Sequence, residues 1–278
     1  MILQLNFRDL DYVHPPGSLT QILAHPDPEK NEAIELALFQ EHRYAFFFWN
    51  KWTQKLRKNL AYSNTAPCLV TFDWHQDLAW PTSEQKKWLD DLDLSNNRDV
   101  ALYSWANLTH INDEQIMAAA YLNLIGNIYV LCRQGKQPAH WEDKVFTDKF
   151  GNTHTVKKFK TYDAVESHLL KSEEQKVYFD IDIDFFVLDS PLSGTGKRFS
   201  YLKKNDIVAI LDHDRPLISW IFKRMQGFTI ATEPEHTGGL MKSNKFLNLL
   251  NRIYFKPGLF TSIPGKWHKG TQWKHLNK

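Results

Sequence analysis

The chain has 278 residues, enough to bury a large core, and its 42% hydrophobic and 24% charged residues are typical of a globular protein rather than a disordered one. Its net charge of +2 argues against a dedicated nucleic-acid-binding protein. No run of about 18 apolar residues occurs, and the N-terminus lacks a basic stretch followed by a long apolar one, so we expect neither a membrane span nor export.

The two cysteines, Cys68 and Cys132, lie in the apolar runs APCLVTF and NIYVLC. Such positions indicate buried, reduced thiols rather than a disulfide. Together with the absence of an export signal, they predict a cytoplasmic protein.

Strand and helix signals alternate along the chain. The segment IELALF predicts a strand over 34–39, and apolar residues at helical spacing predict a helix over 43–58. The other predictions, in chain order, are strands over 68–72, 99–103, 127–132, 177–186 and 227–232, and helices over 113–124, over 204–225 and from near 239. This alternation favours an α/β fold with a mostly parallel sheet covered on both faces, a three-layer α/β/α sandwich in a single domain over 1–278.

Two further segments have patterns of their own. Alternating apolar and polar residues around Gly151-Asn152 predict a hairpin inserted near 140–160. Residues 256–278 hold several lysines and no acid, and they predict a basic, peripheral tail with little regular structure.

The stretch VYFDIDIDFF carries Asp180, Asp182 and Asp184 at alternate positions of an otherwise apolar run. In a strand, alternate side chains point to the same face, so we expect the three carboxylates to share one face and Phe179 and Ile181 to lie on the other.

A second polar cluster follows another buried-strand signature. Asp73, His75 and Asp77 stand at alternate positions directly after the apolar run that begins at Cys68. Ligands of open parallel sheets bind outside the carboxyl ends of strands, so the two clusters can converge on one site. Each cluster alone could instead form turns or helix caps.

Carboxylates held this close together repel unless a positive charge lies among them, and a divalent metal supplies that charge. A set rich in oxygen, with imidazole and without thiolate, favours a hard cation such as Mn²⁺, with Fe²⁺, Co²⁺ or Zn²⁺ as alternatives. The number of carboxylates favours two ions about 3.5–4 Å apart, with an activated water as nucleophile, over a single ion.

The two clusters resemble the metal-binding motifs of the ureohydrolases, the superfamily of arginase, agmatinase and their distant deacetylase relatives. Asp73-Trp74-His75-Gln76-Asp77 matches the first motif, Asp-x-His-x-Asp, in full. The second motif, Asp-x-Asp, fits either Asp180 and Asp182 or Asp182 and Asp184. We favour the second alignment, because Tyr178 to Asp184 follows the deacetylase pattern Tyr-x-Asp-x-Asp-x-His, whose last two polar positions are ligands. This alignment leaves Asp180 as a carboxylate that supports the ligands.

The resemblance implies three further site residues. His42, between a predicted strand and a predicted helix, corresponds to a histidine ligand of arginases. Glu233, with Glu235 as the alternative, corresponds to the glutamate that pairs with the substrate guanidinium. His110, in Asn-Leu-Thr-His, corresponds to the proton shuttle, although the inserted Thr departs from the family's Asn-Leu-His.

The resemblance also bears on the substrate. Leu78-Ala79 stands where arginases that take free arginine usually have Ile-Asn, whose Asn binds the α-carboxylate. This favours the branch of peptide arginases, which convert arginine side chains of a ribosomal precursor peptide to ornithine and release urea. The alternatives are hydrolysis of a small guanidino compound, hydrolysis of another C–N bond, and a non-catalytic peptide-binding protein. The absence of adjacent histidines counts against a deacetylase.

Overall fold

The computed structural model describes residues 13–58, 66–134, 143–192, 198–260 and 270–277. Within these residues, the strands of the main sheet are β1 (Leu19–Ala24), β2 (Ala33–Phe39), β3 (Cys68–Asp73), β4 (Ile128–Cys132), β5 (Lys144–Thr147), β6 (Thr153–Phe159), β7 (Val177–Asp182) and β10 (Met225–Ala231). Their spatial order is β1-β2-β10-β7-β3-β4-β6-β5. All neighbours are parallel except β1 with β2 and β5 with β6 at the two edges, so the predicted mostly parallel sheet is confirmed.

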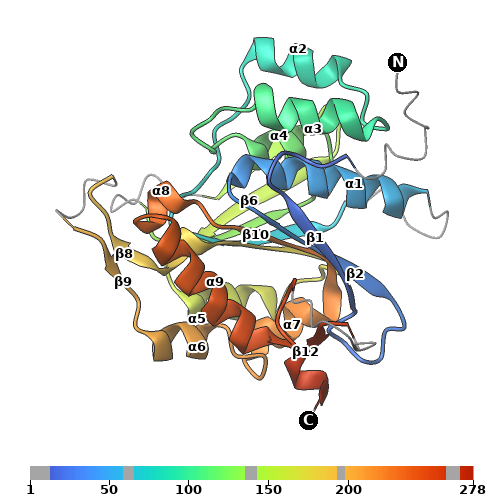
Figure 1. Cartoon of the computed structure of the whole chain (residues 1–278). Coiled ribbons are helices and arrows are strands. Elements are labelled where there is room, and N and C mark those ends of the chain that lie inside the picture. Colours follow the sequence, from blue (N-terminus) through green and yellow to red (C-terminus); the bar gives the residue numbers. More distant parts are fainter. Residues whose placement is uncertain (1–12, 59–65, 135–142, 193–197, 261–269, 278) are drawn as a thin grey trace, which may run out of the picture.

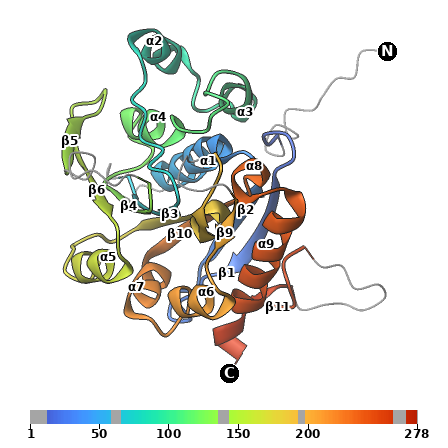
Figure 2. The same cartoon turned by 90° about the vertical axis from the view of Figure 1, so that its left-hand side faces the viewer.

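Helices cover both faces of this sheet (Figures 1 and 2). One face packs against α1 (Ala45–Arg57), α2 (Ser83–Asp91), α3 (Asn97–Ala106) and α4 (Gln115–Tyr121). The other packs against α5 (Tyr162–Leu169), α6 (Lys204–Ile210), α7 (Pro216–Arg224) and α9 (Leu240–Tyr254). Because each helix layer meets one set of alternating strand side chains, two apolar clusters form on opposite sides of the sheet. The expected three-layer sandwich is therefore confirmed.

The strand β7 shows the predicted alternation, but it is shorter than predicted. Phe179 and Ile181 belong to the apolar cluster on the α5, α7 and α9 side, and Tyr178 belongs to the opposite one. The strand ends at Asp182, whose carboxylate accepts a hydrogen bond of 3.0 Å from the Asp184 backbone N–H, and a 3-10 helix follows over Ile183–Phe186. The prediction of a strand through 186, with all three carboxylates on one strand face, is therefore wrong for Asp184.

The predicted strand over 99–103 is a helix, α3. Asn96 caps it by accepting a hydrogen bond of 3.1 Å from the Arg98 N–H and donating one of 2.8 Å to Asp99. A short apolar run such as VALY fits either a strand or a helix, and the cap together with packing against α1 decides for the helix.

The predicted single helix over 204–225 is two helices, α6 and α7. Pro216 is the first residue of α7, where its missing N–H costs nothing, whereas inside a continuous helix it would remove a backbone hydrogen bond. The residue before it, Arg215, is correspondingly extended.

The C-terminal residues are better integrated than predicted. The short strand β12 (Gln272–Trp273) pairs with β11 (Phe255–Lys256), and the Trp273 side chain is fully buried. Its indole N–H donates to the Ala24 carbonyl at 2.7 Å, and its ring stacks near Phe228. The expectation of a peripheral tail is therefore wrong for residues 270–277, and residues 261–269 lie outside the described residues.

Several smaller features complete the fold. The hairpin around Gly151 is formed by β5 and β6, and Gly151 has the left-handed backbone (φ +87°) that such turns need. Both cysteines are free and buried. A third short antiparallel pair joins β8 (Val187–Asp189) to β9 (Ser200–Tyr201). Among the described residues, no helix is long and apolar enough to cross a membrane.

The helix α1 packs closely against β10. Trp52 is buried, and its indole N–H donates to Glu35 at 2.8 Å. Its ring lies directly over Gly227 of β10, where any added Cβ would overlap the indole carbons. The close approach of α1 to β10 thus depends on glycine at this position.

We therefore expect Gly227→Ala to lower the free energy of unfolding by about 1–3 kcal/mol, since the ring or the strand must shift to relieve the overlap. Urea unfolding followed by tryptophan fluorescence measures this. The matched control is Gly270→Ala, whose added Cβ meets no atom of the described residues within 4 Å. Equal stability of the two variants would contradict the packing argument.

Candidate metal centre

The candidate site lies at the carboxyl edge of the parallel strands β2, β10, β7 and β3. Asp73 and Asp182 are the last residues of β3 and β7, and His42 opens a 3-10 helix after β2. Glu233 follows β10 and precedes the short helix α8 (Pro234–Thr237). Because parallel strands end at the same edge of a sheet, residues far apart in the sequence meet here.

The first cluster surrounds His42, which is fully buried. Its Nδ1 atom lies 2.9 Å from Asp77 Oδ2, 3.3 Å from Asp182 Oδ2 and 3.4 Å from Asp73 Oδ2. Its Nε2 atom lies 2.9 Å from Asp180 Oδ2. One side of the imidazole is thus held by a carboxylate, as in the outer shell of many metal sites, and the other faces three carboxylates.

Asp180 is held entirely by protein groups. The hydroxyls of Thr71 and Thr229 donate to it at 2.6 and 2.5 Å. Both threonines are its register partners on the flanking strands β3 and β10. With His42 as a third partner, both oxygens of this buried carboxylate are satisfied, which leaves it in the supporting position expected from the second alignment.

Three of the four other aspartates of the site share a different pattern: one oxygen is fixed by a backbone N–H and the other is not. Asp73 accepts from the His75 N–H at 2.6 Å, Asp182 from the Asp184 N–H at 3.0 Å, and Asp184 from the Trp74 N–H at 3.0 Å. In the described part of the chain, the buried Oδ2 atoms of Asp73 and Asp182 have no hydrogen-bond partner, and Oδ2 of Asp184 meets only the His75 imidazole. Oriented, unpaired oxygens of this kind suit a bound cation.

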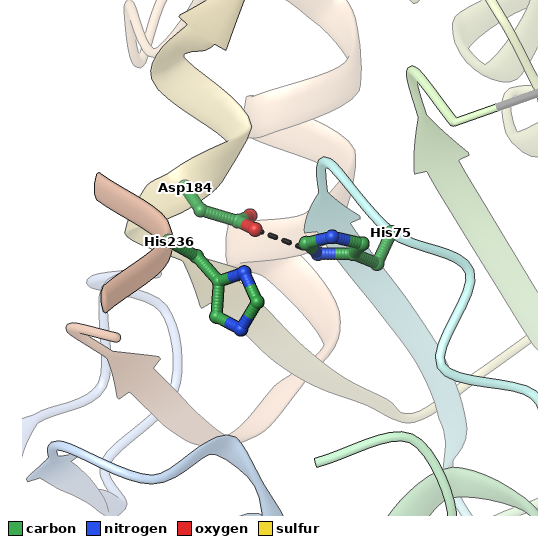
Figure 3. A group of neighbouring side chains, drawn as sticks. All are labelled: His75, Asp184 and His236. Carbon is green, nitrogen blue, oxygen red and sulfur yellow. Dashed lines mark ion pairs between the residues drawn. The ribbon is translucent and has the colours of Figure 1, made fainter. Parts of the chain in front are cut away.

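The second cluster consists of His75, Asp184 and His236 (Figure 3). His75 Nδ1 lies 2.8 Å from Asp184 Oδ2 and 3.9 Å from Asp73 Oδ1. The His236 ring stands edge-on to His75, with ring centroids 4.9 Å apart. The residues come from the loop after β3, the 3-10 helix after β7 and α8, so a second group of imidazole and carboxylate donors forms beside the first.

Glu233 is buried between the two clusters, with a strained backbone (φ +29°). Its Oε1 atom accepts hydrogen bonds from Asn112 Nδ2 at 2.6 Å and from the His42 N–H at 3.2 Å. Its Oε2 atom lies 3.9 Å from His236 Nε2. The carboxylate is therefore fixed through one oxygen and offers the other. Glu235, the alternative for this role, is exposed.

A pocket of about 550 Å³ opens beside these residues. It is lined by His75, Gln76, Asp77, Leu78, Ala79, Ile111, Asp113, Gln134, Lys144, Glu233 and His236. His110, the predicted proton shuttle, is exposed and is not among the lining residues. The structure therefore does not bring His110 to the site, although it brings all the other predicted site residues together.

The crowding of acids has a clear electrostatic effect. Burial and the charges of Asp77, Asp184 and Asp182 raise the pKa of Asp73 well above its usual value. Burial and the charges of Asp184 and Glu233 do the same to the pKa of Asp182. Burial and neighbouring carboxylates raise the pKa of Glu233 to about 8. These groups cannot all stay ionised at neutral pH unless added positive charge lies among them, so the residues present fit divalent cations.

The pKa values of His42 and His75 are raised as well, because neighbouring carboxylates outweigh burial. Burial alone would lower the pKa of His42, but Asp180 and its other acidic neighbours raise it well above the ordinary value. Likewise, burial opposes Asp184 at His75, and the carboxylate prevails and raises the pKa of His75 to about 9. At Asp184 itself, burial is outweighed by the His75 imidazole, and the pKa is lowered. In the absence of metal, these imidazoles therefore carry part of the missing positive charge.

Three residues of the site were missed by sequence reasoning. Asn112 fixes Glu233, and Gln115 Nε2 donates to Asp77 at 2.9 Å. His236 joins the second cluster. The nearest sequence signal was the spacing of His236 three residues after Glu233, in the turn already singled out. Nothing local marks Asn112 or Gln115, because their partners lie on other elements.

No protein-family profile matches the chain, and no curated protein matches it. Among solved structures, it is similar to proclavaminate amidino hydrolase from Streptomyces clavuligerus, with 13% identity, a TM-score of 0.39, and coverage of 70% of this chain and 54% of that one. It is also similar to agmatine ureohydrolase of Thermoplasma volcanium, with 15% identity, a TM-score of 0.36, and coverage of 78% and 60%. The chain thus spans little more than half the length of either structure, and both likenesses are distant.

Two substitutions separate the alternative ligand assignments. Asp184→Asn should lower the number of Mn²⁺ ions bound at saturation, because it removes the negative charge of a carboxylate that we assign as a metal ligand. Asp180→Asn should keep the number and weaken affinity about 10–100-fold, because Asp180 only orients His42. Equilibrium dialysis with metal analysis measures both. The control is Asp163→Asn, whose side chain is 90% exposed. Full occupancy in Asp184→Asn, or a lost ion in Asp180→Asn, would overturn this assignment.

The raised pKa values also predict how stability depends on pH. Asp73, Asp182 and Glu233 keep protons in the folded chain that the unfolded chain loses above about pH 4, so metal-free stability falls as pH rises. The raised pKa of His75 acts in the same direction above its ordinary value of 6.5. With a chelator present, the midpoint of thermal unfolding should fall between about pH 6 and about pH 8. Mn²⁺ replaces the protons and should raise it more at the higher pH.

The lowered pKa of Asp184 opposes this trend only in acid. Near neutrality, the lowered pKa values of His14, His25, His168 and His236 oppose it, against the raised values of Asp73, Asp182, Glu233, His42 and His75. Differential scanning fluorimetry with and without Mn²⁺ measures the effect. A pH-independent midpoint with chelator, or an equal Mn²⁺ increment at both pH values, would refute the electrostatic account of the cluster.

Proposed function

We propose that the chain is a metal-dependent hydrolase of a guanidino group, in the ureohydrolase superfamily that its motifs resemble. The observation that carries this proposal is the set of buried aspartates, Asp73, Asp182 and Asp184, each with one oxygen anchored by a backbone N–H and the other facing the imidazole donors. Buried carboxylates without a counter-charge would be strongly destabilising, so the arrangement suits a cofactor rather than a purely structural role.

The donor residues form two sets that share Asp73 and Asp182. His42, Asp73, Asp77 and Asp182 would hold one ion, and His75, Asp73, Asp182 and Asp184 the other. Hard oxygen donors with imidazole favour Mn²⁺. When bound, such ions supply positive charge and activate water for attack at neutral pH.

Glu233 is the proposed substrate-binding group. Asn112 and the His42 N–H hold its Oε1 atom, so its Oε2 atom is left to accept a hydrogen bond from a guanidinium group. A bound guanidinium would also offset the repulsion that raises the pKa of Glu233. Fixing the substrate cation in this way orients its central carbon toward the two clusters.

The reaction adds water to the guanidinium carbon, breaks its bond to the side-chain nitrogen, and releases urea and an amine that must gain a proton. Because of where the two histidines lie, we assign the proton-transfer role to His236 rather than to His110. His236 lines the pocket beside Glu233 and is 31% exposed, so it can exchange protons with solvent.

The finer proposal is that the substrate is an arginine side chain within a peptide, such as a precursor peptide of a modified natural product. The pocket wall carries Leu78 and Ala79, neither of which offers a polar side chain to a free α-carboxylate. The backbone N–H of Ala79 is already donated to the Asp113 carbonyl at 2.9 Å. A pocket wall that offers no group to bind a free α-carboxylate suits an arginine whose α-amino and α-carboxyl groups are in peptide bonds.

A second candidate substrate is a small guanidino amino acid. Lys144 and Asp113 both line the pocket, and their opposite charges would complement the carboxylate and ammonium of such a molecule. The two candidates differ in what they predict for free arginine.

We expect the Mn²⁺-loaded chain to convert an N-acetylated, C-amidated tripeptide with central arginine to its ornithine form and to leave free arginine and agmatine unchanged. Mass spectrometry of the three incubations, with urea release as a second readout, tests this. Conversion of free arginine alone would favour the small-molecule candidate. No conversion of any of the three, under Mn²⁺, Fe²⁺, Co²⁺ or Zn²⁺, would contradict the guanidino assignment.

The variant pair Glu233→Gln and Glu235→Gln serves as the control. Glu233→Gln should lower turnover at least about 100-fold while it retains metal, because it removes the charge that binds the substrate. Glu235→Gln should behave like the parent, since Glu235 is exposed. Equal loss in both variants would contradict the assignment of Glu233.

A further inference from the structure

A second pocket, of about 560 Å³, lies at the far end of α9 from the candidate metal centre. It is lined by Lys204, Val208, Asp212, His213, Leu249, Arg252, Ile253, Tyr254, Lys256, Lys274 and His275. The helix α9 begins next to α8 (Figure 1). It ends at Tyr254, which lines this pocket, whereas α8 carries His236. Its 15 residues span about 22 Å at 1.5 Å per residue, so the two pockets are separate sites.

The rim of this pocket is strongly basic. Four of its side chains are lysine or arginine, and Asp212 is the only acid among the lining residues. Asp212 lies 3.3 Å from the His213 imidazole, whose other nitrogen lies 3.1 Å from Asp214, so the carboxylate is already engaged. Within the described residues, no carboxylate pairs with Lys204, Lys256 or the Arg252 guanidinium. The rim therefore has positive charge available for a ligand.

The inner wall of this pocket is apolar, with one exception. Tyr254 is 1% exposed, and its hydroxyl is buried without a hydrogen-bond partner in the described part of the chain. Burial raises the pKa of this hydroxyl well above its usual value, so it stays protonated and can donate. An unsatisfied buried hydroxyl is unfavourable, and a ligand that accepts its hydrogen bond would remove that penalty.

The histidines add a flat surface to the same pocket. The rings of His213 and His275 are stacked, with centroids 5.1 Å apart and an interplanar angle of 22°. His275 Nε2 lies 2.8 Å from the Pro26 carbonyl, which fixes its orientation. Together with Val208 and Ile253, these rings offer apolar contact below the cationic rim.

We propose that this pocket binds a small organic anion, a phosphate or carboxylate group carried on an apolar or aromatic body. The cations and the donating Tyr254 hydroxyl match the anionic group, and the apolar side chains match the body. The volume lies within the range of about 300–1,000 Å³ that is usual for small-molecule sites. An inorganic anion would leave the wall uncovered, and a neutral apolar molecule would leave the cations unpaired.

Isothermal titration calorimetry of the full chain, at low ionic strength in phosphate-free buffer, tests this proposal. Four probes separate the parts of the ligand: adenosine monophosphate, N-acetyltryptophan, adenosine and inorganic phosphate. At least one of the two organic anions should bind at least about tenfold more tightly than adenosine and than phosphate. Binding of the monophosphate alone identifies a phosphate ligand, and binding of N-acetyltryptophan alone a carboxylate ligand.

Variants locate the binding. The double variant Arg252→Ala with Lys256→Ala should weaken the organic anion at least about tenfold. Lys245→Ala, also on α9 and exposed but outside the pocket, should leave it unchanged. Tyr254→Phe removes only the hydroxyl and should weaken binding about 2–10-fold without lowering the thermal midpoint, since it also removes an unsatisfied buried group.

Three results would overturn the proposal: no probe binds, the bound probe is insensitive to the double variant, or binding is unchanged in Tyr254→Phe. Binding of a glutamate-rich peptide in place of the small anions would also overturn it, in favour of a protein partner. None of these readouts involves guanidino hydrolysis, so the pocket and the proposed function can fail independently.

Discussion

The concentration of buried negative charge at the carboxyl edge of the sheet is the constraint on which the site depends. Asp73, Asp182 and Glu233 hold protons more tightly than usual because burial and like charges disfavour ionisation. Without a cofactor, His42 and His75 carry the compensating charge. Cations bound at this cluster would reduce the repulsion between its carboxylates. The free energy of unfolding and the affinity for metal are therefore coupled through the same charges.

Strands and hydrogen bonds fix the positions of the acidic side chains in this site. Asp180 is fixed by threonines on the two strands that flank β7, so its carboxylate cannot turn away from His42 without losing both hydroxyl hydrogen bonds. Glu233 is fixed by Asn112, from the segment before α4, and by the His42 backbone. Groups positioned by strands and by satisfied hydrogen bonds keep their geometry better than groups on free loops, as a site for oriented attack requires.

The two pockets differ in the charge of the residues that line them. Among the described lining residues, the pocket beside the candidate metal centre has three acids and one lysine, and the pocket at the far end of α9 has four basic side chains and one acid. In a parallel α/β sheet, the helices return toward the amino ends of the strands, so a helix that begins at the carboxyl edge of the sheet ends on the opposite side. A ligand in the basic pocket would therefore lie apart from the candidate metal centre.

The sequence by itself determined the fold class and most of the cluster, because both rest on local patterns. Strand periodicity placed Phe179 away from Asp180, and alternate spacing marked Asp73, His75 and Asp77. Only the tertiary structure decided which aspartates keep an unpaired oxygen, since hydrogen-bond partners such as Thr229 come from distant strands. The same holds for residues that pack or pair across the chain: His236 joins the site, His110 does not, and Trp273 enters the core, because such contacts depend on long-range packing that no local pattern encodes.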